Sequence, residues 1–293
     1  MEINEKLIEV QSRIQALYDD GVPFFTKAVL REIYEQIKDP LEEGQTILVR
    51  GLDGELVEFD VETGVSRGAS PPSLEHVSTK PHICYQSMQL FKQQATPGPF
   101  AYCNLKIYHD TTLRDKVTEE SVVTMPTSNY SLVKARFDKS LSLWESSRAC
   151  RQLTTTVSNM IFPRDFKIDK IIGFACGPIS HAKSNRHDKL SLALREKSFF
   201  QHGLLRTLQK TLQEEGFHNI DIFVQDPAYT DVDCEVLSDY GIITLDDPEG
   251  FLALDDRSLV MSCDPGIPVK QIVADIARPA MIIWDTNSNE EVF

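Results

Sequence analysis

The second half of the chain alternates short apolar runs with stretches in which apolar residues recur every three or four positions. The apolar runs end in polar turns and cover residues 170–174, 220–225, 242–245, 258–262 and 280–284. Helical patterns stand between most of them, at residues 198–215, 231–240 and 269–276. Short buried strands that alternate with helices are typical of βαβ units. The pattern predicts an α/β fold with a doubly wound, mostly parallel sheet.

The N-terminal part has a different pattern. Apolar spacing predicts an amphipathic helix over residues 3–20, which Gly21 and Pro23 end, and a second helix from about residue 27 to residue 38. Beyond it, Asp53-Gly54 separates two alternating runs, a strong hairpin signal because both central turn residues need positive φ. We expect this helical and β-hairpin region to pack on the sheet domain, with binding of a partner protein as the alternative.

The middle of the chain is less regular. Glycine, proline and serine are frequent over residues 63–80, which predicts a loop or linker. A long helix is predicted from about residue 133 to residue 160. We therefore divide the chain into N-terminal helices and hairpin (1–62), an irregular connecting region (63–134) and the α/β core (135–293).

Composition narrows the class of protein. Hydrophobic content of 41% with 25% charged residues is ordinary for a soluble globular protein. The formal net charge of −14 argues against general nucleic-acid binding. The first residues show no basic region followed by an apolar stretch, so we expect no secretory signal. No apolar run approaches the roughly 18 residues that span a bilayer, so we expect no membrane partner. The six scattered cysteines form neither a disulfide framework nor a metal motif, which favours a cytoplasmic or nuclear location and no metal site.

The turn after the first core strand is the best candidate for a ligand site. Gly173 and Gly177 are four residues apart, and Ser180 follows. Ligands of open α/β sheets bind outside the carboxyl ends of the strands, where glycines let backbone N–H groups approach a phosphate or carboxylate. The spacing does not match the dinucleotide or P-loop motifs. The alternative is a tight strand-to-helix turn that needs small residues.

Two further features could serve the same ligand. The segment 183–197 is basic and includes Lys189, which could contact an anion, although such segments also form solvated loops. Asp226 follows the second core strand, where a carboxylate can hold the ribose hydroxyls of a nucleotide or of S-adenosylmethionine. Asp-Pro also starts turns, so Asp226 could instead cap the next turn.

Two cysteines follow core strands and could border the same cleft. They are Cys176, in the glycine turn, and Cys263. A nucleophilic cysteine needs a positioned base, and inert buried thiols are the alternative. We assign no catalytic residue.

Several short motifs occur in a fixed order. They are Gly173-x-x-x-Gly177-x-x-Ser180, Gln201 at the start of a leucine-rich helix, Asp226-Pro-Ala-Tyr-Thr230, Leu237 with Gly241, and Glu249-Gly250. In this order they resemble the SRR1-like domain family over roughly residues 135–285. Trp144 and Ser147 are similar to its fungal branch. The third motif adds Tyr229 to the candidate ligand-binding residues.

The resemblance implies a Rossmann-like domain with a regulatory role: light signalling and circadian control in plants, and growth control and haem-linked regulation elsewhere. It implies no reaction. Many members have Met-Pro-His-Cys after the fourth core strand, whereas this chain has Met261-Ser-Cys-Asp264, so no role of that histidine carries over. The segment Trp284-Asp-Thr-Asn287 also departs from the family pattern.

Three hypotheses of function follow. The first is a regulatory SRR1-like protein whose strand-end cleft binds a small anionic ligand, such as a nucleotide. The second is a group transferase that uses S-adenosylmethionine. The glycines and acidic residues at the strand ends favour this hypothesis. The third is a protein-interaction module that binds its partner through the N-terminal helices.

Overall fold

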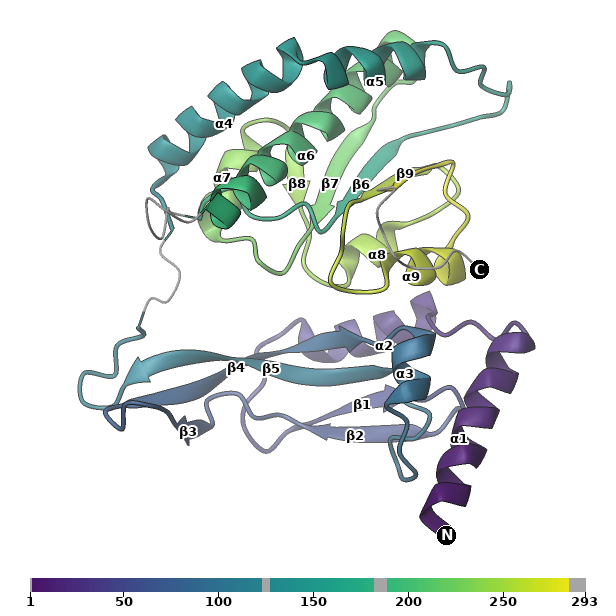
Figure 1. Cartoon of the computed structure of the whole chain (residues 1–293), viewed down its shortest axis with the longest axis vertical. Coiled ribbons are helices and arrows are strands. Elements are labelled where there is room, and N and C mark those ends of the chain that lie inside the picture. The colour runs from purple at the N-terminus through teal and green to yellow at the C-terminus, as the bar shows by residue number, and fades with distance from the viewer. Residues whose placement is uncertain (1, 123–126, 182–188, 285–293) are drawn as a thin grey trace. The chain divides into compact units, whose positions relative to one another are not determined.

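The computed structural model describes residues 2–122, 127–181 and 189–284, with side chains left out for residues 2–3 and 189–195. The chain forms two compact units, each described by itself (Figure 1). The N-terminal unit comprises Met1–Thr124 and Ile267–Ile276, and the C-terminal unit comprises Met125–Gly266 and Ala277–Phe293. Much of the predicted basic segment, including Lys183 and Arg186, lies outside the described residues.

The N-terminal unit combines helices with two antiparallel sheets. Its elements are α1 (Glu2–Asp19), α2 (Lys27–Ile37), β1 (Thr46–Arg50), β2 (Leu56–Asp60), β3 (Ser66–Gly68), β4 (Leu74–Tyr85), α3 (Met88–Gln93), β5 (Leu105–Asp115) and α9 (Val269–Ile276). Strands β1 and β2 form the predicted hairpin, in which Gly54 has a φ of 88°. The sequence prediction of both N-terminal helices and of this hairpin is confirmed.

The prediction of a loop over residues 63–80 is wrong. Strands β3 and β4 pair antiparallel there, and β4 pairs with β5 to complete a three-stranded sheet. The glycine and proline signals belong to the turns around these strands: Gly64 has a φ of 85° in the turn before β3, and Pro71 and Pro72 lie between β3 and β4. Turn residues so closely spaced read as one loop in a sequence although they separate two strands.

Helix α9 completes the N-terminal unit although it follows β9 in the sequence. Its Asp275 Oδ2 accepts hydrogen bonds from the backbone N–H groups of Phe24 (2.9 Å) and Phe25 (3.1 Å). Its Gln271 Oε1 accepts from Met88 N (3.0 Å) in the first turn of α3. Both contacts satisfy N–H groups of the unit's buried residues, since Phe24, Phe25 and Met88 are all buried.

The C-terminal unit is built on a five-stranded parallel sheet. Its elements are α4 (Tyr130–Ser146), α5 (Arg148–Ser158), β6 (Lys170–Phe174), α6 (Lys189–Glu214), β7 (Asp221–Gln225), α7 (Asp231–Ser238), β8 (Ile242–Thr244), α8 (Glu249–Ala253), β9 (Ser258–Ser262) and β10 (Met281–Trp284). The strand order is β10-β9-β6-β7-β8, with all neighbours parallel. The chain winds from its first strand, β6, to both sides of the sheet, as in a Rossmann-like doubly wound fold. The predicted α/β class is therefore confirmed.

Apolar side chains line both faces of this sheet, because helices cover a parallel sheet on either side. Ile171, Val224 and Met261 point to the face that packs with α4 and α6. Phe174 points to the other face, where its ring stacks on Phe251 of α8 at 4.4 Å between centroids. Figure 1 shows α4, α5 and α6 together as one layer of helices.

The single helix predicted over residues 133–160 is divided in two. Ser147 has extended backbone dihedral angles (φ −73°, ψ 157°) and separates α4 from α5. Its side chain accepts a hydrogen bond from Cys150 N (3.0 Å), so it is the N-cap of α5. The apolar period continues through the break, which is why the sequence pattern did not reveal it.

Candidate functional site

The carboxyl edge of the parallel sheet brings most of the predicted site residues together. Strand β6 is central, and the chain winds from it to β7 and β8 on one side and to β9 and β10 on the other. The ends of β6 and β9 are direct neighbours, since Phe174 is in register with Ser262. Such a reversal of winding is the switch point at which open α/β sheets bind ligands.

The predicted residues reach this edge from three strands and one helix. Gly173 lies in β6, and Cys176, Gly177 and Ser180 follow it; Asp226 and Tyr229 follow β7, and Cys263 follows β9. Lys189 is the first residue of α6, and its side chain lies outside the described part.

The glycine turn needs its small residues. A Cβ on Gly173 would lie 2.8 Å from Cys176 Sγ and 2.9 Å from Leu205 Cδ1. A Cβ on Gly177 would lie 2.4 Å from Ser198 Oγ, and its φ of 74° is in the left-handed region. Steric crowding therefore excludes larger residues at both positions.

Carboxylates of the same chain already bind the amides of this turn. Gly177 N donates to Asp226 Oδ2 (2.8 Å). The N–H groups of Ile179 and Ser180 both donate to Asp233 Oδ1 (2.7 Å each). A phosphate could reach these amides only if a carboxylate moved away, so an anion at this edge must find its main charge partner elsewhere.

Asp233 is the residue that sequence reasoning missed. Its fully buried carboxylate accepts five hydrogen bonds, from Ile179 N, Ser180 N, Ser180 Oγ, Thr230 N and Thr230 Oγ1. Thr230 and Asp233 form a capping box at the start of α7. The Thr-x-x-Asp spacing could have revealed the cap, but not the bonds to a turn about fifty residues earlier.

Tyr229 is tied to a buried histidine of α6. His202 Nδ1 lies 2.7 Å from the carbonyl oxygen of Ser198, and His202 Nε2 lies 2.8 Å from the Tyr229 hydroxyl. A carbonyl only accepts, so Nδ1 carries the proton and Nε2 accepts from the tyrosine O–H. Burial lowers the pKa of His202 to about 4, against the partial compensation of the Ser198 carbonyl and the Asp233 charge. The imidazole is therefore neutral at physiological pH.

Cys176 is a poor nucleophile. Cys176 is fully buried, and this burial raises the pKa of its thiol well above the ordinary value, with the charge of Asp226 and the neighbouring Cys263 adding to the shift. Burial also raises the pKa of the Tyr229 hydroxyl. A thiol that stays protonated does not attack an electrophile, so the geometry favours the structural interpretation of Cys176.

Lys197 is the basic residue of segment 183–197 whose side chain the structure describes. Its Nζ lies 3.3 Å from Asp264 Oδ2, directly after β9, and both side chains are exposed. The adjacent Ser198 touches the glycine turn, so this part of α6 lies beside the ends of both β6 and β9. Exposed ion pairs contribute roughly 1 kcal/mol or less, so Lys197 can exchange Asp264 for another anion.

Ser262, at the end of β9, is a further polar group at this edge. Its side chain is 1% exposed, and its hydroxyl finds no hydrogen-bond partner among the described residues. A buried hydroxyl without a partner costs free energy, so it is a candidate group for a ligand or an ordered water.

The motif Glu249-Gly250 has a packing explanation. Gly250 N donates to the buried Gln225 Oε1 (2.7 Å), whose Nε2 donates to Asp247 Oδ1 (2.8 Å). A Cβ on Gly250 would lie 2.7 Å from that same Gln225 oxygen. The glycine is therefore needed to bring α8 close to the end of β7.

Within the described ranges, no three His, Cys, Asp or Glu side chains are grouped in a way that could hold a metal ion. The described helices include none with the length and apolar character needed to cross a membrane.

Removal of the Asp233 charge should destabilise the protein. In Asp233→Asn, an NH2 group would face donors in place of a carboxylate oxygen, and we expect unfolding free energy to fall by about 3 kcal/mol. Urea denaturation measures the loss. Asp231→Asn, at an exposed position of the same helix, is the control. Equal stability of the two variants would contradict the role of Asp233.

His202 should make stability depend on pH. Its folded-state pKa of about 4 is below the ordinary 6.5, so the unfolded chain takes up the proton first as pH falls. The contribution of His202 to the free energy of unfolding is therefore complete above pH 6.5 and falls between about pH 6.5 and pH 4. It changes no further below pH 4, and the total loss is about 3 kcal/mol. Urea titrations of His202→Gln should lack this component, whereas the exposed His218→Gln should retain it. Identical profiles of both variants would refute the assignment.

Comparison with known proteins agrees with this geometry. Residues 150–291 match the sequence model of the SRR1 domain, a range that contains the parallel sheet and its carboxyl edge. Neither the search of curated proteins nor that of solved structures gave a match. The fold, the ordered motifs and the domain match together identify residues 150–291 of this chain as an SRR1 domain.

Proposed function

We propose that this SRR1-like protein is a regulatory protein, acting in signalling, circadian or growth control, whose C-terminal unit binds a small anionic ligand at the switch point. A nucleotide is the ligand class that suits the site. The proposal includes a cytoplasmic or nuclear location and membership of the fungal branch.

Two residues carry this proposal: Lys197, which pairs with Asp264 after β9, and Asp226, which follows β7 and accepts from the turn after β6. Lys197 supplies a positive charge that its exposed pair with Asp264 holds only weakly. Asp226 is half-buried and accepts one N–H at each oxygen, from Gly177 at Oδ2 and from Ala228 at Oδ1. A carboxylate has about four lone-pair sites, so acceptors remain for two ribose hydroxyls.

The other candidate residues lie around the proposed site and support its framework. Cys176 and Ser180 are fully buried, and the Ser180 hydroxyl donates to Asp233. Lys189 remains a proposed contact of the ligand's negative charge. Cys263 borders the proposed site on the β9 side.

Ligand-binding measurements on two variants test the proposal. Isothermal titration with adenosine, adenosine nucleotides and S-adenosylmethionine should give a dissociation constant for at least one phosphorylated ligand. We expect Lys197→Gln to weaken that ligand about tenfold, as for the loss of one charge-assisted hydrogen bond, and to leave the affinity for adenosine unchanged. Asp226→Asn should weaken both the nucleotide and the nucleoside.

Matched controls make the same changes away from the site. Lys210→Gln lies at the far end of α6, and Asp256→Asn lies before β9, at the opposite edge of the sheet; both side chains are exposed. Unchanged affinities in the two site variants would overturn the site assignment. Binding of S-adenosylmethionine alone would favour the group-transferase alternative. Absence of binding for every ligand would favour a protein-interaction module.

A further inference from the structure

A second recognition site can be located on the β1–β2 hairpin of the N-terminal unit. The hairpin is a two-stranded antiparallel sheet in which Thr46 pairs with Asp60 and Arg50 pairs with Leu56. Gly51 N donates to Glu55 O, and Val61 N donates to Gln45 O. Since hydrogen-bonded and non-bonded pairs alternate, the odd-numbered residues bond across the hairpin. The N–H and C=O groups of the even-numbered residues therefore point away from it.

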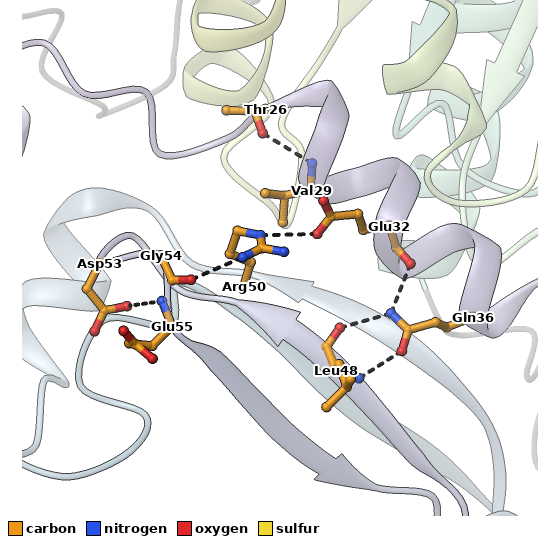
Figure 2. A network of polar contacts seen from close by, with 9 residues as sticks. All are labelled: Thr26, Val29, Glu32, Gln36, Leu48, Arg50, Asp53, Gly54 and Glu55. Atoms are coloured by element: carbon orange, nitrogen blue, oxygen red, sulfur yellow. Dashed lines mark hydrogen bonds and ion pairs between the residues drawn. The ribbon is translucent and has the colours of Figure 1, made fainter.

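The outer edge of β1 is closed by a side chain. The Gln36 amide of α2 accepts from Leu48 N (2.8 Å) and donates to Leu48 O (2.9 Å), as Figure 2 shows. These two bonds imitate those of a neighbouring strand. Arg50 extends the contact, because its side chain reaches Glu32 (3.3 Å) and the carbonyl of Gly54 (3.1 Å). Strand β1 is therefore protected at its centre.

The outer edge of β2 has no such cover. Leu56, Glu58 and Asp60 are exposed, and no other described residue bonds to their outward backbone groups. An exposed strand edge is a template for pairing with another extended chain. Leu56, 49% exposed, and Leu48 add apolar surface to the solvent-facing side of the hairpin.

The charge around the outer edge of β2 determines which kind of extended segment can pair with it. Residues 42–62 contain seven carboxylates and one cation, Arg50, which is engaged by Glu32. A second copy of this chain would place like charges opposite each other, which is destabilising in a cross-strand pair. A strand that carries lysine or arginine would instead meet opposite charges.

We propose that the free edge of β2 binds an extended, lysine- or arginine-rich segment of another protein, which adds to the hairpin as a third strand. The outward backbone groups of residues 56, 58 and 60 supply the main-chain hydrogen bonds, and the surrounding carboxylates select a basic partner. This site is separate from the proposed ligand site and does not depend on it.

A model peptide tests the proposal directly. Fluorescence anisotropy of a labelled peptide of alternating lysine and valine should show saturable binding to the full chain, and the glutamate–valine counterpart should not bind. Leu56→Pro removes one outward N–H without a change of charge and without loss of a bond to β1, because proline is tolerated on edge strands. We expect it to weaken the peptide at least about tenfold, whereas Leu56→Thr, which keeps the N–H, should change affinity less than about twofold.

Two outcomes would overturn the proposal. One is absence of binding to the wild-type chain. The other is equal affinity of the proline and threonine variants, which would indicate charge attraction without strand addition. Circular dichroism first establishes that Leu56→Pro is folded.

If the proline variant does not fold, hydrogen exchange on the wild-type chain decides the question. Peptide should slow exchange of the outward amides of residues 56, 58 and 60, and leave the amides of residues 57 and 59 unchanged. Unchanged exchange at the three outward amides would reject strand addition.

Discussion

The buried carboxylate of Asp233 holds the carboxyl edge of the sheet together. It joins the turn after β6 to the start of α7 through five hydrogen bonds, and no described lysine or arginine forms an ion pair with it. Bonds of this kind, with a charged acceptor, are stronger than neutral ones. They fix the glycine turn in place, and Asp226 adds a second tie through Gly177. The groups left for a ligand are consequently those around this framework, above all Lys197 and the remaining acceptors of Asp226.

The fold of the C-terminal unit could be predicted because its strands are continuous apolar runs. The central strands β6 and β9 are buried on both faces, and that requirement is visible in the sequence. The wrong secondary-structure predictions occurred where one local sequence signal is compatible with two structures. The prolines and glycines of residues 63–80 mark turns between strands rather than a loop, and Ser147 caps a new helix inside an unbroken apolar period. The domain boundaries near residues 62 and 134 remain predictions.

The candidate site was predictable as a location but not as a set of bonds. Parallel strands bring their carboxyl ends to one edge, so Gly177, Asp226 and Cys263 could be expected there. Which carboxylate accepts from which amide depends on side-chain directions after folding. Asp233 follows Ser180 by 53 residues and shows no spacing that links the two. The grouping of α9 with the N-terminal unit was equally hidden, because the bonds from Phe24 and Phe25 to Asp275 join the two ends of the chain.

Native mass spectrometry of the freshly purified protein, followed by denaturation, tests the switch-point site most directly. We expect a mass excess that is released on denaturation as a small anion, such as a nucleotide. We also expect the Asp226→Asn, Lys197→Gln double variant to purify without this excess. A wild-type protein that carries no small molecule and gains none when nucleotides are added would contradict the proposed site.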